Sequence, residues 1–168
     1  MKHSIYTLAI SLMVFFVSCE KEDDDNDIDN GDNTELEYGE MTDSRDGKKY
    51  KTIQIGDQVW MAENLAYAPT SGNYSAYDND DAKVQIYGYL YNWETACDVC
   101  PDGWHLPRDD EWKQLEDYLI ANGYNYDGST YGDKIAKSLA SKNLWEPSSD
   151  VGDIGNDPQS NNSSGFTA

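Results

Sequence analysis

The sequence predicts an α+β fold, and two observations support this prediction. Residues 51–65, "KTIQIGDQVWMAENL", place two runs rich in β-branched and aromatic residues on either side of Gly56-Asp57, a pattern typical of a β-hairpin with a two-residue turn. From Asp109 onward, apolar residues recur at intervals of three and four, which is typical of one stripe of an amphipathic helix. Strands and a helix in separate segments indicate α+β.

The hairpin also predicts part of the core. A two-residue turn pairs Ile55 with Gln58 and Ile53 with Trp60. Because side chains alternate along a strand, Ile53, Ile55 and Trp60 then share one face, and Val59 and Met61 lie on the other. We expect the isoleucine and tryptophan face to be buried.

The next segment divides into a predicted loop and a predicted strand. Residues 68–83, "APTSGNYSAYDNDDAK", are turn formers and acids without periodicity, which predicts a long surface loop. Tyr87, Tyr89, Tyr91 and Trp93 then alternate with other residues, so a strand would place all four rings on one face. Such a row is typical either of a half-buried core stripe or of a platform that stacks on sugars.

The stretch "CPDGWHLPRDDEW", residues 100–112, is interpreted as a structural strand-to-helix element. Its proline at position 107 keeps the preceding residues out of helical geometry, and the acids at positions 109–111 suit the first turn of a helix. Trp112, Leu115 and Leu119 form the apolar stripe, and Asn122-Gly123 supplies a stop signal. The acids therefore have a structural role without any catalysis.

Composition limits the function classes. The chain has 168 residues, with 32 acids against 12 bases and a net charge of −20. Such a surface repels phosphate backbones, which argues against nucleic-acid binding. Thirteen tyrosines and five tryptophans predict a core that relies on aromatic rings.

Few residues qualify for catalysis or metal binding. His105 is the only histidine after residue 18. A catalytic pair of Cys100 and His105 would need an orienting group that the sequence does not show. Cys97, Cys100 and His105 lack a second pair at zinc-ligand spacing. We therefore expect no catalytic residue, no metal and no cofactor, and we interpret His105 as a packing residue beside Trp104.

Residues 1–18 are interpreted as a secretion signal. A lysine near the start is followed by an apolar run over residues 5–17, which is too short for a comfortable membrane span. The run stops at Ser18-Cys19, which resembles the bacterial lipobox, although Phe16 stands where that pattern usually has leucine. The resemblance implies that Cys19 is acylated and anchors the protein in outer-membrane lipid. The alternative is an ordinary signal peptide with a chance cysteine.

Residues 19–37 are predicted to be an acidic, disordered tether behind the lipidated cysteine. Residues 20–37 hold ten acids and one lysine, and like charges at this density cannot bury a core. Lys21, Glu22 and Asp23 follow Cys19 closely and resemble the lipoprotein export signal of Bacteroidetes, which implies display on the outer face of the outer membrane. The alternative is a plain acidic spacer on a lipoprotein that faces the periplasm.

The segment 38–168 resembles the Fibrobacter succinogenes major paralogous domain. "GWHLPRDDEW" matches the family signature, and "IQIGDQVWMAENLAY", "YGYLYNW" and "SSGFTA" resemble further blocks in the same order. The resemblance implies a C-type-lectin-like fold without established enzymatic activity. It also implies a longer second half, so the chain is interpreted as a fragment. The positions carried by these blocks are Trp60, Trp93, Gly103, Trp104, His105, Leu106, Pro107, Glu111 and Trp112.

Two pairings remain open for the C-x-x-C of this exported chain. Cys97 and Cys100 either bond to each other, or one of them bonds to a cysteine in the half that the resemblance implies. A redox role is disfavoured, because the surrounding acids raise rather than lower a thiolate pKa.

The expected function is binding or adhesion, with polysaccharide or envelope proteins as partners. Loop tyrosines supply flat apolar area with a polar tip at low entropic cost, and Tyr74, Tyr77, Tyr124 and Tyr126 lie in predicted loops or turns. The alternative is that these tyrosines pack under the loops. An enzyme of the formylglycine-generating type and a purely structural envelope protein are the alternative functions.

Overall fold

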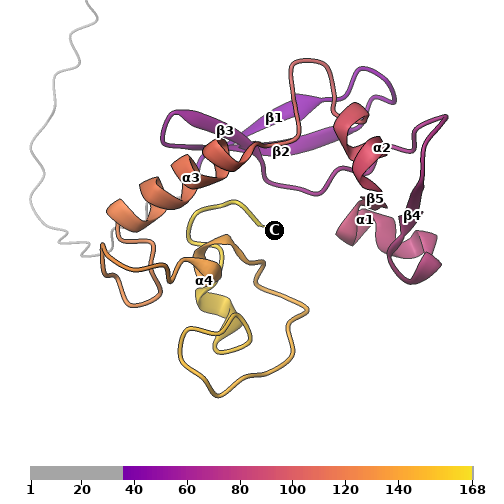
Figure 1. Ribbon diagram of the computed structural model, residues 1–168. Helices are drawn as coiled ribbons and strands as arrows, with labels where there is room; N and C mark the ends of the chain where they lie inside the picture. Colours follow the sequence, from indigo (N-terminus) through magenta and orange to yellow (C-terminus); the bar gives the residue numbers. More distant parts are fainter. Residues whose placement is uncertain (1–35, 168) are drawn as a thin grey trace, which may run out of the picture. The chain divides into compact units, whose positions relative to one another are not determined.

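The computed structural model describes residues 36–167, and its architecture confirms the α+β prediction (Figure 1). A three-stranded antiparallel sheet has the order β1-β2-β3, and a two-stranded antiparallel sheet contains β4 and β5. The strands are β1 (Tyr38–Thr42), β2 (Lys49–Ile55), β3 (Gln58–Met61), β4 (Tyr74–Ala76) and β5 (Tyr89–Tyr91). The α-helices are α1 (Val84–Tyr87), α2 (Trp93–Asp98), α3 (Asp109–Ala121) and α4 (Ala136–Leu139). Short 3₁₀ turns lie at η1 (Tyr77–Asn79), η2 (Asp81–Lys83) and η3 (Pro158–Ser160).

The predicted hairpin is confirmed in detail. Ile55 pairs with Gln58 and Ile53 with Trp60 across the Gly56-Asp57 turn, where Gly56 adopts a positive φ of 59° that glycine accommodates without strain. Ile53, Ile55 and Trp60 are buried, whereas Val59 is exposed. The two-residue turn therefore set the face that each side chain occupies.

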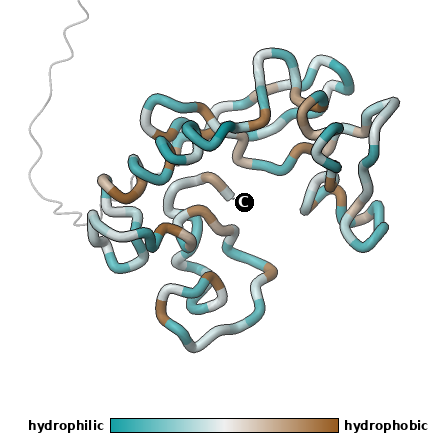
Figure 2. Tube along the Cα trace, viewed as in Figure 1, coloured by the Kyte–Doolittle hydropathy of each residue, from teal (hydrophilic) through white to brown (hydrophobic). Residues whose placement is uncertain are grey.

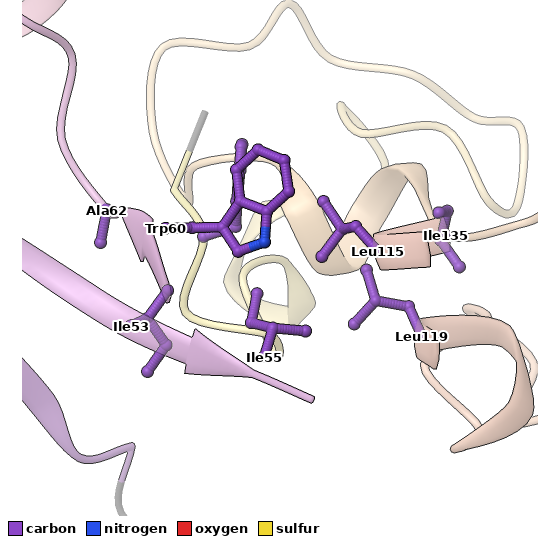
Figure 3. Close-up of a cluster of buried hydrophobic side chains, with 8 residues drawn as sticks. Ile53, Ile55, Trp60, Ala62, Leu115, Leu119 and Ile135 are labelled. Atoms are coloured by element: carbon purple, nitrogen blue, oxygen red, sulfur yellow. The ribbon is translucent and has the colours of Figure 1, made fainter. Parts of the chain in front are cut away.

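The core lies between this sheet and α3 (Figure 3). Ile53 and Ile55 from β2 and Trp60 from β3 face Leu115 and Leu119 from α3, both of which are fully buried. Each such leucine contributes roughly 1.5–3 kcal/mol by leaving water. The complete buried cluster is Ile53, Ile55, Trp60, Ala62, Leu115, Leu119, Ile135 and Phe166.

Helix α3 begins and ends where its sequence predicts. Asp109, Asp110 and Glu111 occupy the first turn, where carboxylates offset the helix dipole. The Glu111 carboxylate accepts a hydrogen bond from the backbone N–H of Arg108 at 2.9 Å, which satisfies one orphan donor. At the other end Gly123 has a φ of 78°, and Tyr124 N–H donates to Leu119 C=O at 3.0 Å. These bonds close the last turn.

Residues 68–83 lie mostly at the surface as predicted, but they are not an irregular loop throughout, and the prediction for the aromatic row was wrong. The expected loop contains strand β4 and two 3₁₀ turns, one of which is capped by Asp80 accepting from Ala82 N–H at 3.0 Å. The expected strand is broken at Gly88, whose φ of 64° and ψ of −157° separate α1 from β5. Only Tyr89 and Tyr91 of the row lie in a strand. Asn92 then caps α2, so Trp93 begins a helix.

The segment after α3 is built largely from side-chain bonds to loop backbone. Asn125 is buried, and its amide nitrogen donates to carbonyl oxygens of Ser129 and Tyr131 at 2.8 and 3.1 Å. Lys137 is also buried, and its ammonium donates to the carbonyl oxygens of Asp153 and Asp157, each at 3.3 Å. The tube in Figure 2 is mainly hydrophilic in colour, so the apolar stretches of the domain are short.

Several sequence predictions fall outside this part of the chain. The signal segment 1–18, Cys19, and the Lys21, Glu22 and Asp23 signal lie before residue 36 and outside the described residues. Within residues 36–167, the helices are all too short or too polar to span a bilayer. The C-type-lectin-like assignment remains a prediction.

Candidate functional site

A groove of about 590 Å³ runs beside β3, and most of the predicted motif residues line it. This volume falls in the usual range of ligand pockets, about 300–1,000 Å³. The motif residues in its wall are Trp60, Gly103, Trp104, His105, Leu106, Pro107, Glu111 and Trp112. The stretch that the sequence marks as structural therefore also forms the wall of a concave surface.

Local backbone geometry places this wall. Trp104 N–H donates to Pro101 C=O at 2.9 Å, and Gly103 has a φ of 83°, so the chain turns sharply before the tryptophan. Arg108 is the last non-helical residue, and α3 starts immediately after it. The segment from Trp104 to Pro107 thus lies extended between a tight turn and a helix, and it follows the side of the groove.

Three aromatic rings that line the groove contact one another. The ring centroid of Trp60 lies 4.8 Å from that of Trp112 and 5.5 Å from that of Phe166, and Trp112 and Phe166 are 5.9 Å apart. Trp60 and Phe166 are buried, but 37% of Trp112 is exposed. The trio is therefore both part of the core and an apolar surface that a ligand can reach.

His105 is not the packing residue that the sequence predicts. Its side chain is largely exposed, and Nε2 lies 2.8 Å from each carboxylate oxygen of Glu111. Arg108 reaches the same carboxylate through Nη2 at 3.2 Å. These donors, led by the backbone N–H of Arg108, lower the pKa of Glu111 below its usual range. Glu111 is thus an ionised acceptor that ties the wall of the groove to α3.

The two cysteines of the C-x-x-C are free thiols in this structure. Cys100 lies in the groove wall, and burial raises the pKa of its thiol, so it lacks the depressed pKa of a reactive thiolate. Arg45 holds the backbone here by donating to the carbonyl oxygens of Val99 at 2.8 Å and Cys100 at 3.3 Å. Residues 36–167 contain no cluster of three or more histidine, cysteine or acidic side chains arranged to hold a metal ion.

The four predicted tyrosines do not form one platform. Tyr74 contacts Tyr89 with ring centroids 5.0 Å apart, and Tyr77 contacts Tyr87 at 5.1 Å. Tyr124 instead packs against the core beyond the end of α3. Tyr126 follows it, and its ring lies against Gly152. Figure 1 shows β4 and the end of α3 far apart. Tyr74 and Tyr77 therefore lie in one region of the domain, and Tyr124 and Tyr126 lie in another.

Comparison with family models decides which family this is. The sequence model of the Fibrobacter succinogenes major domain matches residues 53–168, more than half of the chain. The chain belongs to the Fibrobacter succinogenes major domain family. Comparisons with curated proteins and with solved structures gave no match.

The folded domain is larger than the region matched to the Fibrobacter succinogenes major domain. The match begins at Ile53, within β2, yet β2 starts at Lys49, and its residues from Lys49 to Ile53 pair with β1. The groove lies inside the matched region. Sequence reasoning missed Phe166 and Tyr91 as groove residues, although the "SSGFTA" and "YGYLYNW" blocks that contain them were the available signal. Trp93 does not line the groove, because the helix that starts at Trp93 leaves its side chain 75% exposed.

Proposed function

We propose that this chain is a lipid-anchored protein of the outer membrane, exposed at the cell surface, whose folded domain binds polysaccharide without catalysing a reaction. The proposed lipid anchor rests on Cys19. The proposed location at the cell surface rests on the sequence of Lys21, Glu22 and Asp23. The binding role rests on the exposed aromatic side chains of one part of the domain.

These side chains belong to the aromatic lobe, which we define as residues 74–98. In this lobe β4 pairs with β5, α1 contacts η2, and α2 contacts β5. Exposed apolar groups of this kind mark interaction sites when they gather in one region. The exposed large apolar residues of the lobe are Tyr74, Tyr77, Ile86, Leu90 and Trp93, and this exposure is the observation that carries the proposal.

The lobe also holds its rings in place before any ligand arrives. Tyr91 Oη donates to Tyr67 C=O at 2.7 Å, and burial raises the pKa of Tyr91 well above its usual range. Tyr74 rests against both Tyr89 and Tyr91. Rings that are already fixed lose little entropy on binding, and a sugar ring offers an apolar face that stacks on them.

The charge states of two carboxylates, Glu111 and Asp78, favour binding over glycoside cleavage. Glycoside cleavage needs one carboxylic acid with a raised pKa. The Glu111 carboxylate has a lowered pKa because it accepts bonds from Arg108 and His105. Asp78, in the lobe, is paired with Lys83 at 2.5 Å. Glu111 and Asp78 therefore both act as acceptors for basic side chains.

The test is binding of the full chain, solubilised in mild detergent, to a panel of insoluble polysaccharides. Tyr77→Ala and Trp93→Ala should each weaken binding to a retained polysaccharide by about tenfold, since each removes a stacking contact worth about 1.4 kcal/mol. Tyr131→Ala is the matched control, because Tyr131 is 73% exposed but lies outside the lobe. It should bind like the parent chain.

Two results would contradict the proposal. Retention of no polysaccharide by the parent chain would favour a purely structural envelope role. Equal retention by the parent, Tyr77→Ala and Trp93→Ala would place any glycan site outside the lobe.

A further inference from the structure

The aromatic lobe contains a single basic side chain, and a carboxylate of the lobe already holds it. Residues 74–98 include five acids and one lysine, Lys83. The Lys83 ammonium lies 2.5 Å from the Asp78 carboxylate and 4.8 Å from the centre of the Tyr77 ring. Within residues 74–98, which the structure describes in full, no cation is therefore left for an incoming ligand.

The arginine at the border of the lobe is likewise paired. Arg45 donates to the carbonyl oxygen of Val99, immediately after the lobe, at 2.8 Å. Its guanidinium also forms an ion pair with the fully buried Asp43 at 2.6 Å. Proteins hold anionic groups mainly with arginine and lysine donors, so neither Lys83 nor Arg45 is available to an acidic ligand.

Three carboxylates of the lobe lack a basic partner. Asp81, Glu94 and Asp98 are exposed and form no ion pair with another residue of the described chain. Asp81 begins η2, four residues after Tyr77, and Glu94 directly follows Trp93 in α2. Glu94 and Asp98 are four residues apart on this helix, where like charges on one face repel. The two exposed rings are thus close in the chain to uncompensated negative charge.

The rings themselves disfavour acidic sugars. The face of an aromatic ring carries the negative part of its quadrupole, so it attracts cations and repels anions. A neutral sugar presents C–H groups to such a face. A uronate or a sulfated sugar instead brings negative charge toward the face of Trp93 and toward the carboxylate of Glu94, the next residue.

We propose that the aromatic lobe selects polysaccharides without acidic groups, and that Asp81, Glu94 and Asp98 exclude uronate and sulfated chains by repulsion. Specificity is a difference between two affinities, and a repulsive element contributes to it as an attractive one does. The net charge of −20 acts in the same direction over longer distances. This selectivity rests on the proposed binding of polysaccharide at the lobe, and it specifies which class of polysaccharide is admitted.

The experiment compares charged and uncharged forms of one polymer. An insoluble neutral polysaccharide that the full chain retains in mild detergent is lightly carboxymethylated, and a second portion is hydroxyethylated to the same degree as a steric control. At low salt the parent chain should prefer the hydroxyethylated form to the carboxymethylated form by about tenfold or more. The preference should shrink at about 1 M salt, where charges are screened beyond about 3 Å.

A charge-removing variant tests the three carboxylates. The combined substitution of Asp81→Asn, Glu94→Gln and Asp98→Asn should lower the preference about tenfold at low salt. This is the size expected for three unit charges that act through water at about 10 Å. The variant should fold, because it relieves the repulsion between positions 94 and 98, and a thermal melt checks this.

The matched control removes three charges elsewhere in the domain, by Asp57→Asn, Glu116→Gln and Asp133→Asn. These acids are exposed, lie outside the lobe and form no ion pair with another described residue. The control should keep the preference of the parent chain. Tyr77→Ala and Trp93→Ala should weaken retention of both polymer forms and leave the preference between them in place.

Loss of selectivity and loss of binding are distinguishable outcomes. Retention of no polysaccharide would remove the proposed function and the selectivity with it. Retention that depends on Tyr77 and Trp93 but is equal for the two polymer forms would overturn the selectivity alone, as would a first panel in which only acidic polysaccharides are retained. An equal loss of preference in the two triple variants would assign the exclusion to the charge of the whole chain, and not to the acids of the lobe.

Discussion

The Arg45 guanidinium joins three parts of the domain. Its Nε and Nη2 donate to the two carboxylate oxygens of Asp43 at 2.8 and 2.6 Å, and Nη1 donates to the carbonyl oxygen of Val99. The guanidinium carbon also lies 3.7 Å from the centre of the Tyr67 ring. Asp43 is fully buried, and the hydrogen bonds from Arg45 lower the pKa of its carboxyl group. This bidentate pair holds the groove wall to the end of β1.

Replacement of Asp43 should reveal the contribution of this pair. Asp43→Asn keeps the shape but removes the charge, so we expect a loss of about 2 kcal/mol in the free energy of unfolding at pH 7. Because the folded-state pKa of Asp43 is lowered, its stabilisation is present above the unfolded pKa of about 3.9 and is lost as pH falls below it. The difference between parent and variant should therefore shrink below about pH 4.

Urea unfolding at pH 7 and at pH 3 measures both effects. Glu40→Gln is the control, because Glu40 forms an exposed ion pair with Lys49 at 2.7 Å that contributes about 0–1 kcal/mol. A difference for Asp43→Asn that stays constant with pH would show that packing, and not the charge of Asp43, provides the stabilisation.

At the scale of elements, Gly88 decides where α1 ends and β5 begins. Its φ of 64° with a ψ of −157° is a region that only glycine adopts readily. A Cβ at this position would lie 2.5 Å from the carbonyl oxygen of Leu65. Tyr89 N–H also donates to that oxygen, at 3.0 Å. The backbone at residues 65 and 88–89 therefore packs too closely for any side chain at Gly88.

Two glycine substitutions separate the effect of backbone strain from that of close packing. Gly88→Ala should lower the free energy of unfolding by about 3 kcal/mol, since it adds strain and a steric clash. Gly47→Ala is the matched variant, because Gly47 has a φ of 75° with nothing within 4 Å of the added Cβ. It should cost only about 1 kcal/mol. Equal losses in urea unfolding would show that the contact with Leu65 is unimportant.

The whole molecule combines a folded, aromatic-rich domain with a strongly acidic leading segment. Residues 20–37 carry ten of the 32 acids, so much of the negative charge precedes the domain.

Lipidation and surface export are both tested on the full chain in cells. Cys19→Ala should abolish labelling by a clickable fatty acid, because the acylated thiol is lost. Replacement of Lys21, Glu22 and Asp23 by alanine should hide the protein from protease added to whole cells. The control replaces Asp24, Asp25 and Asp27 by alanine, which removes acids but keeps the predicted signal, and it should leave protease access unchanged.

Each arm of this test has a contrary outcome. Fatty-acid labelling that persists in Cys19→Ala would remove the lipoprotein assignment. Equal protease access in all three chains would remove the export signal, and the acidic segment would then be a plain spacer.

The sequence by itself determined the parts of this protein that local periodicity controls. The β2–β3 register follows from a two-residue turn, and the buried face follows from the alternation of Ile53, Ile55 and Trp60. The bounds of α3 follow from its acidic first turn and from the stop at Gly123. In these elements the decisive interactions join residues only a few positions apart, so the pattern of residue types was sufficient.

Tertiary structure alone decided the groove and the aromatic lobe. Phe166 meets Trp60, and Arg45 meets the carbonyl oxygen of Val99, across separations that no local pattern records. The alternating aromatic row was wrongly predicted as one strand, because its period of two is equally compatible with a strand broken at Gly88. Pairing energy between distant segments becomes available only after the chain has brought them together. The sequence therefore predicted the motif residues, but not that they would line a groove beside β3.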